Sequence, residues 1–469
     1  GVFVQHSSLT SHAVTFRVGA VAHQWHLPCW MRFLASWLCA CASSGVAAVA
    51  ASSSAGDGCG KQAPWVPGEL TRASVEVPGG AGPSGEALAR TFFVSLPPAY
   101  ELGRRHPVLL FFHGWGMNAE KIAEKDDLGV LGGREGWIVV HAMGMSDVPD
   151  SFVVTKDFTW GSWNGSGTVA SPGPAGPICA PTTSPEPCYN TCGGCKDHCW
   201  WTTCADDVAF VSRLMDELES TLCVDTSRVV ASGFSNGGIF LYELASNPVV
   251  SSRLAAIAPV AGLPHIGFNR PPATPLFFFG LWGRADTEVP GVHHDGEARQ
   301  VGPEGATVSK DGYYYTPAKQ VVELWAAGLQ AQHFETSLDG EQGLDCSGYF
   351  PKGSDTGASF PSVVACTWDG AHNWTVSLAS RLVVQVLLRS FSAPSPPSAA
   401  APAVRLASGP QRLEAPAAGS FDVSGQIPPT WILGFLFSAL FPGAYFAHLG
   451  CRRAAAGSKE AAMWSPLLG

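Results

Sequence analysis

A serine between two glycines, where an apolar run meets a helix-like run, is the feature that most constrains this chain. The segment Gly233-Phe234-Ser235-Asn236-Gly237 follows the strand-like run 228–232 and precedes the helix-like run 238–244. A serine on such a sharp strand-to-helix turn holds its hydroxyl exposed at the edge of a sheet. The flanking glycines are needed because a Cβ at those positions would clash. The segment therefore predicts a nucleophilic Ser235 at a sheet edge.

Apolar runs alternate with amphipathic segments over residues 56–392, which we interpret as one catalytic domain. The predicted strands are 91–96, 108–112, 138–141, 228–232, 255–260, 276–280 and 363–367, and the predicted helices are 206–222, 238–245, 318–327 and 376–389. Continuous apolar strands separated by such helices predict an α/β fold, with a mostly parallel central sheet flanked by helices on both faces. Asp206 and Asp207 stand where a helix begins and are interpreted as structural, because negative charge is stabilised there.

A serine hydroxyl needs a base to take its proton and a carboxylate to orient that base. In the α/β-hydrolase arrangement these groups occur in the order Ser, Asp or Glu, His, on loops after successive strands. Asp286 follows the predicted strand 276–280, and His372 follows the last predicted strand. Glu288 is the nearest rival for the acid, whereas His293 and His294 follow no strand directly. We therefore expect Ser235, Asp286 and His372 to form a catalytic triad.

The turn after strand 108–112 is predicted to form the oxyanion hole. His113-Gly114-Trp115-Gly116 can point backbone N–H groups at a developing oxyanion. We assign the donors to the backbone of Trp115 and of Asn236, and we interpret His113 as organising the turn. In this scheme Ser235 attacks a carbonyl, an acyl-enzyme forms and water cleaves it, so that no metal or organic cofactor is required.

Five segments recur in the order found in a known family. They are 109–116 (LLFFHGWG), 206–210 (DDVAF), 223–229 (CVDTSRV), 233–238 (GFSNGG) and 370–374 (GAHNW). Over roughly residues 59–389 the chain resembles the secreted feruloyl esterase and polyhydroxybutyrate depolymerase-like branch of the α/β-hydrolases. The resemblance implies hydrolysis of carboxylic esters, with Ser235, Asp286 and His372 at the matching triad positions. Members of the branch act on plant-wall phenolic esters, acetylated xylan or polyesters.

Ten cysteines lie between the two ends of the predicted domain: 59, 179, 188, 192, 195, 199, 204, 223, 346 and 366. An even number favours a disulfide framework in an exported protein. Six of them crowd into the insert 179–204, a spacing that could alternatively bind zinc. Cys204 and Cys223 are not expected to pair, since a continuous helix between them would separate them by about 28 Å.

Four tryptophans are candidates for the rim of the substrate pocket, because their flat faces can stack on a phenolic ring or a sugar. They are Trp160, Trp163, Trp200 and Trp201; for each one, ordinary packing is the alternative. Two sequons, at Asn164 and Asn373, predict N-glycosylation. We expect Asn164 in an ordinary surface loop, whereas Asn373 directly follows the proposed base.

The two ends of the chain carry signals of export. Residues 31–55 have the basic start, apolar middle and small residues of a signal peptide, and residues 1–30 before Met31 are interpreted as an upstream gene-model extension. N-terminal sequencing of the mature protein would test this. Residues 393–429 are an Ala/Pro/Ser-rich linker, 430–450 a predicted transmembrane helix and 451–469 a short cytoplasmic tail marked by Arg452 and Arg453. A buried core helix is the alternative for 430–450.

The net charge of -10 argues against a nucleic-acid partner. The sequence thus predicts a serine esterase of the secretory pathway, held in a membrane by one C-terminal helix, with its catalytic domain extracellular or luminal. Its expected substrates are feruloyl, phenolic or acetyl esters of polysaccharides. The alternatives are a polyhydroxyalkanoate-type polyester depolymerase, a peptide hydrolase, or a catalytically silent membrane-tethered binding protein that keeps the fold.

Overall fold

The computed structural model describes residues 57–78, 87–155, 158–293, 301–334, 344–351, 362–374 and 376–390. The predicted upstream extension (1–30), signal peptide (31–55), linker (393–429), transmembrane segment (430–450) and tail (451–469) lie outside these ranges. Within the ranges themselves, no helix has both the length and the apolar character needed to cross a bilayer.

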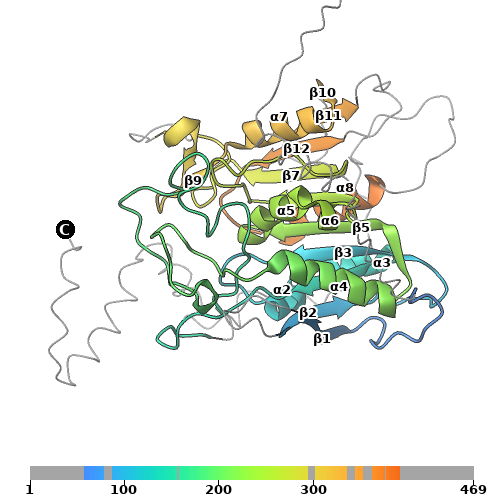
Figure 1. Cartoon of the computed structure of the whole chain (residues 1–469). Helices are drawn as coiled ribbons and strands as arrows, with labels where there is room; N and C mark the ends of the chain where they lie inside the picture. Colours follow the sequence, from blue (N-terminus) through green and yellow to red (C-terminus); the bar gives the residue numbers. More distant parts are fainter. Residues whose placement is uncertain are drawn as a thin grey trace, which may run out of the picture. The chain divides into compact units, whose positions relative to one another are not determined.

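A single ten-stranded sheet forms the centre of the described part of the chain (Figure 1), with the strand order β1-β2-β4-β3-β5-β6-β7-β12-β11-β10. Its strands are β1 (Leu70–Val77), β2 (Leu88–Ser95), β3 (His106–Phe112), β4 (Ile138–Ala142), β5 (Val224–Phe234), β6 (Ala256–Val260), β7 (Phe277–Gly283), β10 (Ala331–Phe334), β11 (Leu344–Pro351) and β12 (Val363–Trp368). The six strands from β4 to β12 run parallel, whereas the pairs at both edges are antiparallel. A separate short ribbon pairs β8 (Thr307–Val308) with β9 (Tyr314–Tyr315).

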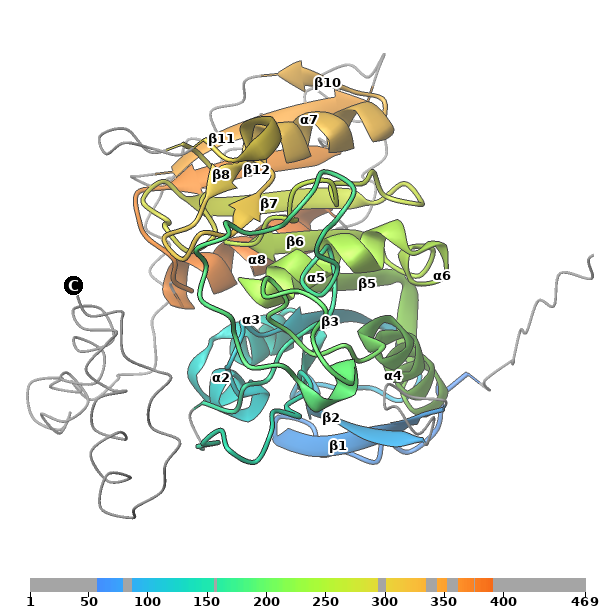
Figure 2. The same cartoon turned by 60° about the vertical axis from the view of Figure 1, so that its left-hand side comes forward.

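Helices cover both faces of the sheet (Figures 1 and 2). One face carries α4 (Asp207–Thr221), α5 (Asn236–Ser246), α6 (Pro248–Ser251) and α7 (Ala318–Gly328), and the other carries α3 (Leu128–Arg134) and α8 (Val376–Ser390) with α2 (Ala119–Lys125) beside them. Alternate residues of the central strands face the two layers. Leu110 packs into the core under α4 and α5, whereas Leu109 faces α3 and α8. The predicted α/β fold with a largely parallel sheet is confirmed, and the arrangement is that of an α/β-hydrolase.

All seven predicted strands and all four predicted helices are present, with small shifts at their ends. The strands that the sequence did not predict are β1 and β10 at the two edges of the sheet, β11 next to β10, and the short ribbon. The sequences of β1 and β11 interrupt their apolar residues with polar ones. β1, for example, buries only Val75 and Val77 and exposes every second residue before them. A partly solvated edge strand lacks the continuous apolar run that identifies a central parallel strand.

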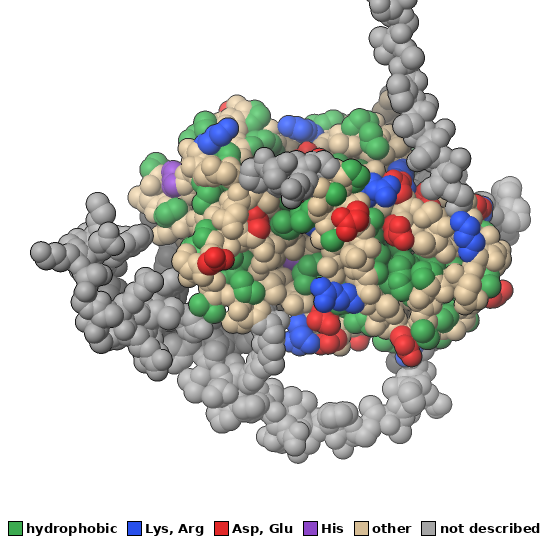
Figure 3. Space-filling view, turned by 60° about the horizontal axis from the view of Figure 1, so that its bottom comes forward, with side chains coloured by type: hydrophobic (Ala, Val, Ile, Leu, Met, Phe, Trp, Pro, Cys, Tyr) green, Lys and Arg blue, Asp and Glu red, His purple; other side chains and the backbone are tan. Residues whose placement is uncertain are grey.

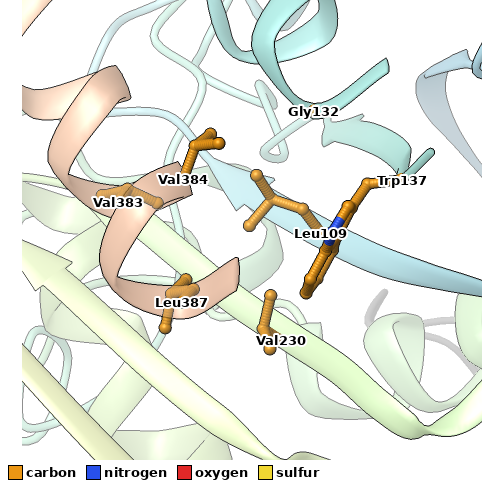
Figure 4. Close-up of a pocket in the computed structure, with 7 residues that line it drawn as sticks. All are labelled: Leu109, Gly132, Trp137, Val230, Val383, Val384 and Leu387. Carbon is orange, nitrogen blue, oxygen red and sulfur yellow. The ribbon is translucent and has the colours of Figure 1, made fainter. Parts of the chain in front are cut away.

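A small apolar cavity lies between the sheet and the α3/α8 layer (Figure 4). Its walls are Leu109, Gly132, Trp137, Val230, Val383, Val384 and Leu387. None of these side chains can titrate, donate a proton to a substrate or act as a nucleophile. We therefore assign the cavity to packing and look for the functional site at the carboxyl ends of the central strands.

The ten cysteines form five disulfides, so that the predicted framework is confirmed. Three of them are local to the insert and join Cys179 to Cys199, Cys188 to Cys195 and Cys192 to Cys204. The other two join Cys59 to Cys223 and Cys346 to Cys366. Cys204 and Cys223 do not pair with each other, as expected. The donor atoms of Cys179, His198 and Cys199 lie within 4.8 Å of one another, but both sulfurs are bonded as a disulfide and provide no thiolate for zinc.

Charged side chains are mixed on the face of the molecule seen in Figure 3, where Lys and Arg stand among Asp and Glu. A nucleic-acid surface would instead gather basic side chains into one patch or stripe. On this face, the described residues form no such patch.

Candidate active site

Ser235 stands on a strained turn between β5 and α5. Its backbone has φ 55° and ψ −120°, which a residue with a side chain rarely adopts. A Cβ at Gly237 would lie 2.1 Å from the Phe112 carbonyl oxygen, and one at Gly233 would lie 2.6 Å from the backbone of Gly237. Both glycines are therefore required by contacts between backbone segments, and the turn holds Ser235 outward from the sheet.

The three side chains of the predicted triad form a continuous chain of hydrogen bonds. The Oγ of Ser235 is 2.8 Å from Nε2 of His372, and Nδ1 of His372 is 2.7 Å from Oδ2 of Asp286. Asp286 is fully buried, whereas Ser235 and His372 are half-buried. This geometry allows His372 to take the proton from Ser235 while the carboxylate of Asp286 faces the other ring nitrogen.

The carboxylate of Asp286 is held in one orientation by its own loop. Oδ1 accepts hydrogen bonds from the backbone N–H groups of Glu288 and Val289, both at 2.9 Å, which leaves Oδ2 directed at His372. Glu288, the rival acid, places its carboxylate against Lys310 at 2.5 Å instead. Of the other two histidines considered, His293 is exposed and His294 lies outside the described residues.

The loops that carry Asp286 and His372 are attached to each other because they follow neighbouring strands. β7 and β12 are parallel and in register, with Gly283 opposite Trp368. A Cβ at Gly283 would lie 2.4 Å from the Gly370 carbonyl oxygen, and the N–H of Ala285 donates to that same oxygen at 2.9 Å. Residues 86 positions apart in the chain are thus held side by side.

The turn after β3 lies directly against Ser235. A Cβ at Gly114 would be 3.3 Å from the Cβ of Ser235. Among the described residues, the backbone N–H groups of Trp115 and Asn236 donate to no protein acceptor. Two free N–H donors beside a nucleophile can receive a developing oxyanion, and the assignment of Trp115 and Asn236 to this role stays a prediction.

His113 organises this turn and does not act as a second base. Its Nε2 accepts a hydrogen bond from the N–H of Gly144 at 2.9 Å, and its Nδ1 then donates to the Gly114 carbonyl oxygen at 2.8 Å. Burial lowers the pKa of His113 to about 4. The ring is therefore neutral, and both of its nitrogens are used by the backbone.

Trp163 does not line the substrate pocket as predicted, because it is 0% exposed. Its indole N–H donates to the His113 carbonyl oxygen at 2.9 Å. Its backbone N–H and C=O both bond the side-chain amide of Asn236, at 2.8 and 3.0 Å. Trp163 thus connects the turn after β3 to the start of α5. The prediction failed because a tryptophan near a site can be buried and support its backbone, and need not line its surface.

The other three tryptophans have different surroundings. Trp201 is only 8% exposed and donates to His265 at 3.0 Å, so that its assignment to the rim is also wrong. Trp200 is half-buried and donates to the Ser171 carbonyl oxygen. Trp160 is half-buried and packs edge-on against Trp115, with ring centroids 5.4 Å apart. Trp160 and Trp163 thus both contact the predicted oxyanion turn, and of these two only Trp160 is partly exposed.

Residues beside this turn that the sequence did not single out complete an aromatic cluster. Phe152 and Phe158 pack against Trp160 at 5.4 and 4.8 Å, and the hydroxyl of Tyr189 accepts from the Trp115 indole and donates to the Trp160 carbonyl oxygen. Tyr189 comes from the cysteine-rich insert, which the sequence marked as unusual. Its contact with Trp115 depends on tertiary folding, and no local pattern predicts it.

The two predicted glycosylation sites differ in exposure. Asn164 is half-buried, and its side-chain nitrogen donates to the Ala205 carbonyl oxygen at 3.1 Å; Ser166, the third residue of the sequon, is 2% exposed. The expectation of an ordinary surface loop at Asn164 is therefore wrong. Asn373 is exposed, and glycosylation there stays a prediction.

The pair of aspartates at the start of α4 is structural, as interpreted. Asp206 caps the helix by accepting from the N–H of Ala209. Asp207 is buried, pairs with Arg90 at 2.7 Å and accepts from the N–H of Asn164. Burial raises the pKa of Asp207, and Arg90 opposes that effect.

The proteins found to be similar in sequence are esterases, which confirms the resemblance drawn from the motifs. The probable feruloyl esterase C of Aspergillus niger (strain ATCC MYA-4892 / CBS 513.88 / FGSC A1513) is 35% identical over 91 residues, 19% of this chain and 33% of that protein. The bifunctional acetylxylan esterase/xylanase XynS20E of Neocallimastix patriciarum is 32% identical over 94 residues, 20% of this chain and 14% of that protein. The match thus spans about a third or less of either relative's length. No family model matches the chain.

Solved structures with similar backbones share little sequence with this chain. The acetyl xylan esterase from Aspergillus awamori has a TM-score of 0.39 and 10% identity, and the similarity covers 68% of this chain and 98% of that one. An S-formylglutathione hydrolase from Agrobacterium tumefaciens has a TM-score of 0.37 and 13% identity, with coverage of 70% and 97%.

Proposed function

We propose that this protein is a serine carboxylic-ester hydrolase that acts by a Ser-His-Asp acyl-enzyme mechanism. The observation that carries the proposal is the unbroken line of hydrogen bonds from Ser235 through His372 to the buried Asp286, at 2.8 and 2.7 Å. A serine at positive φ on a strand-to-helix turn is directed outward from the sheet, and the neighbouring imidazole can take its proton. The similar stretches in esterases support the reaction class.

In the proposed reaction, His372 removes the proton of Ser235 as its oxygen attacks the ester carbonyl. The backbone N–H groups of Trp115 and Asn236 stabilise the oxyanion, and Asp286 stabilises the imidazolium. The tetrahedral intermediate collapses when His372 gives its proton to the departing alcohol. Water then attacks the acyl-enzyme with His372 again as base, which releases the acid and restores Ser235.

We further propose feruloyl, other phenolic or acetyl esters of polysaccharides as the substrates. Two of the proteins similar in sequence are a probable feruloyl esterase and a bifunctional acetylxylan esterase/xylanase. The aromatic cluster around Trp115 and Trp160 supports a ligand with flat apolar faces, such as a phenolic ring or a sugar.

Five disulfides support action outside the cytosol, where such bonds persist. Anchoring of the enzyme through residues 430–450 stays a prediction, which retention of the full chain in membranes after alkaline carbonate extraction would test.

Substitution of Ser235 tests the proposal. Ser235→Ala should lower the turnover of 4-nitrophenyl acetate by about three orders of magnitude or more and abolish labelling by a fluorophosphonate probe. Ser232→Ala is a matched control, because Ser232 is buried in β5 and its hydroxyl only donates to the Ala258 carbonyl oxygen. Release of ferulate, acetate, hydroxybutyrate and peptide from model substrates would then rank the substrate classes. Full turnover in Ser235→Ala, or a wild-type protein that the probe does not label, would refute the proposal.

A further inference from the structure

The predicted oxyanion turn after β3 is bonded to the segment 159–163, which follows β4 in the chain. The N–H of Gly116 donates to the Gly161 carbonyl oxygen at 2.8 Å, and the N–H of Thr159 donates to the Gly116 carbonyl oxygen at 2.9 Å. Gly116 is the residue directly after Trp115, whose backbone N–H is one of the two predicted oxyanion donors. The segment therefore fixes the backbone next to this donor.

The same segment holds the second predicted donor. The side-chain amide of Asn236, which is 0% exposed, bonds the backbone N–H and C=O of Trp163 at 2.8 and 3.0 Å. The indole of Trp163 also donates to the His113 carbonyl oxygen at 2.9 Å, on the other side of the turn. The separation between the N–H groups of Trp115 and Asn236 thus depends on how this one segment is placed.

Tyr189 connects the segment to the turn through a single hydroxyl. The hydroxyl accepts from the Trp115 indole N–H at 3.0 Å and donates to the Trp160 carbonyl oxygen at 2.8 Å. Tyr189 is 1% exposed, and burial raises the pKa of its phenol, so that the hydroxyl keeps the proton that it donates. Trp160 has φ 58°, which a residue with a side chain rarely adopts, and the bond to its carbonyl oxygen stabilises this conformation.

The cysteine-rich insert 179–204 fixes Tyr189 from both sides in the sequence. Cys188, directly before it, is bonded to Cys195, and Cys192, three residues after it, is bonded to Cys204. A covalent link on each side limits how far the Tyr189 hydroxyl can move. Figure 1 shows this part of the chain as green loops at one end of the sheet.

We propose that Tyr189 is a positioning residue for the oxyanion hole, because its hydroxyl sets the Trp115 N–H at the separation from the Asn236 N–H that an oxyanion requires. This rests on the proposed function. Oxyanion donors are effective because they are fixed before the charge develops, and a displacement of about 1 Å can cost about 10²-fold in rate. Tyr189 acts only through Trp115 and contacts neither the substrate nor Ser235 in this proposal.

Tyr189→Phe tests the proposal, because it removes the hydroxyl and keeps the ring. It should lower kcat/KM on 4-nitrophenyl acetate by about 5- to 50-fold, which is less than the loss of about 10²- to 10³-fold that follows removal of an oxyanion donor. It should weaken inhibition by trifluoroacetophenone by a similar factor, since a transition-state analogue reports the same interactions.

The ketone separates positioning from a merely structural role. The oxygen of Ser235 forms a bond to the carbonyl carbon of the ketone, the serine proton passes to His372, and the carbonyl oxygen becomes an anion. Because nothing leaves, the inhibition constant measures the stabilisation of this oxyanion alone. A variant that was only less well folded would contain fewer active molecules, and those molecules would have the wild-type inhibition constant.

Tyr100→Phe is the matched control. The hydroxyl of Tyr100 accepts from the N–H of Cys223 at 2.9 Å, and its ring stacks on His106 at the start of β3, the end away from the oxyanion turn. This variant also loses a buried hydroxyl contact of the same kind. It should keep both kcat/KM and the inhibition constant within about two-fold of the wild type.

Trp115→Phe removes the other partner of the bond and tests it independently, even where Tyr189→Phe does not fold. Its inhibition constant should rise in the same way. If the bond carries the effect, the double variant should lose little more than the more impaired single variant, whereas two independent effects would multiply.

An inhibition constant of Tyr189→Phe within about two-fold of the wild type would overturn the proposal. An equal loss in Tyr100→Phe, or losses that multiply in the double variant, would overturn it as well. Failure of the proposed function would be distinct, because the wild-type protein itself would then hydrolyse no ester and form no adduct with the ketone.

Discussion

Asp286→Asn is the substitution whose effect follows most directly from the geometry. Oδ1 of Asp286 accepts two backbone N–H groups at 2.9 Å, and Oδ2 faces Nδ1 of His372. An asparagine has one oxygen and one NH2 group at these positions. If its oxygen keeps the two backbone donors, its NH2 group points at His372. The ring must then accept at Nδ1 and carry its proton on Nε2, facing Ser235, where it can no longer act as a base.

The alternative orientation restores the correct ring tautomer but places the NH2 group against the N–H groups of Glu288 and Val289. Two buried donors would lose their acceptor, at about 1–3 kcal/mol each, or about 2–6 kcal/mol together. At 1.36 kcal/mol per factor of ten, the competent orientation is populated at about one part in 30 to one part in 10⁴. The expected loss in kcat is therefore about 30-fold to 10⁴-fold, and the upper end matches the effect known for the same substitution in other Ser-His-Asp enzymes.

The assay measures kcat on 4-nitrophenyl acetate and the rate of fluorophosphonate labelling for Asp286→Asn and for Asp345→Asn. Asp345 is a suitable control because its side chain is 79% exposed and only 3.6 Å from Arg284. Both variants should fold, which thermal unfolding checks. An Asp286→Asn protein that keeps more than a tenth of the wild-type kcat, or is labelled at the wild-type rate, would refute the reasoning about the fixed carboxylate.

Gly237→Ala should prevent soluble expression or lower the free energy of unfolding by about 3 kcal/mol or more, because its Cβ would lie 2.1 Å from a backbone oxygen. The control is Gly103→Ala, which has open space around it and should match the wild type in thermal unfolding. Arg90→Met should cost about 3–5 kcal/mol at pH 8, since it leaves Asp207 buried without its cation, whereas loss of the exposed Arg104–Glu101 pair in Arg104→Met should cost under about 1 kcal/mol. Because the pKa of Asp207 is already raised in the folded protein, the cost of Arg90→Met should shrink as the pH falls and Asp207 is protonated. Denaturant unfolding at pH 8 and pH 5 measures the difference in unfolding free energy between Arg90→Met and the wild type. An equal difference at both pH values would contradict this prediction.

The parts of the site that the sequence could predict are those specified by strand position. Ser235, Asp286 and His372 each follow a buried apolar run, and parallel strands bring their carboxyl ends to one edge of a sheet. The glycines at 233 and 237 could be recognised because the turn leaves no space for a Cβ. In these cases a local pattern determines a backbone position, and the topology then determines which positions meet.

The parts that the sequence could not predict depend on which way a side chain points. Trp160 and Trp163 stand three residues apart in one loop, yet one packs beside the predicted oxyanion turn and the other is fully buried behind it. Asn164 has the pattern of a glycosylation site but uses its amide within the fold. Loop residues have no periodicity that separates an inner face from an outer one, so that composition alone cannot assign these roles.

The cysteine-rich insert 179–204 has a local shape that its sequence indicates and long-range contacts that its sequence does not indicate. Its three internal disulfides link residues at most 20 positions apart, so they define its local shape but do not attach it to the sheet. Attachment comes from long-range hydrogen bonds, among them those of Tyr189 to Trp115, Trp201 to His265 and Ala180 to Gly312. An insert with its own disulfides, attached both to Trp115 and to the segment that includes β9, can shape the surroundings of Ser235 and His372 without a change in the central sheet. Substrate preference can therefore change through the insert while Ser235, Asp286 and His372 keep their geometry.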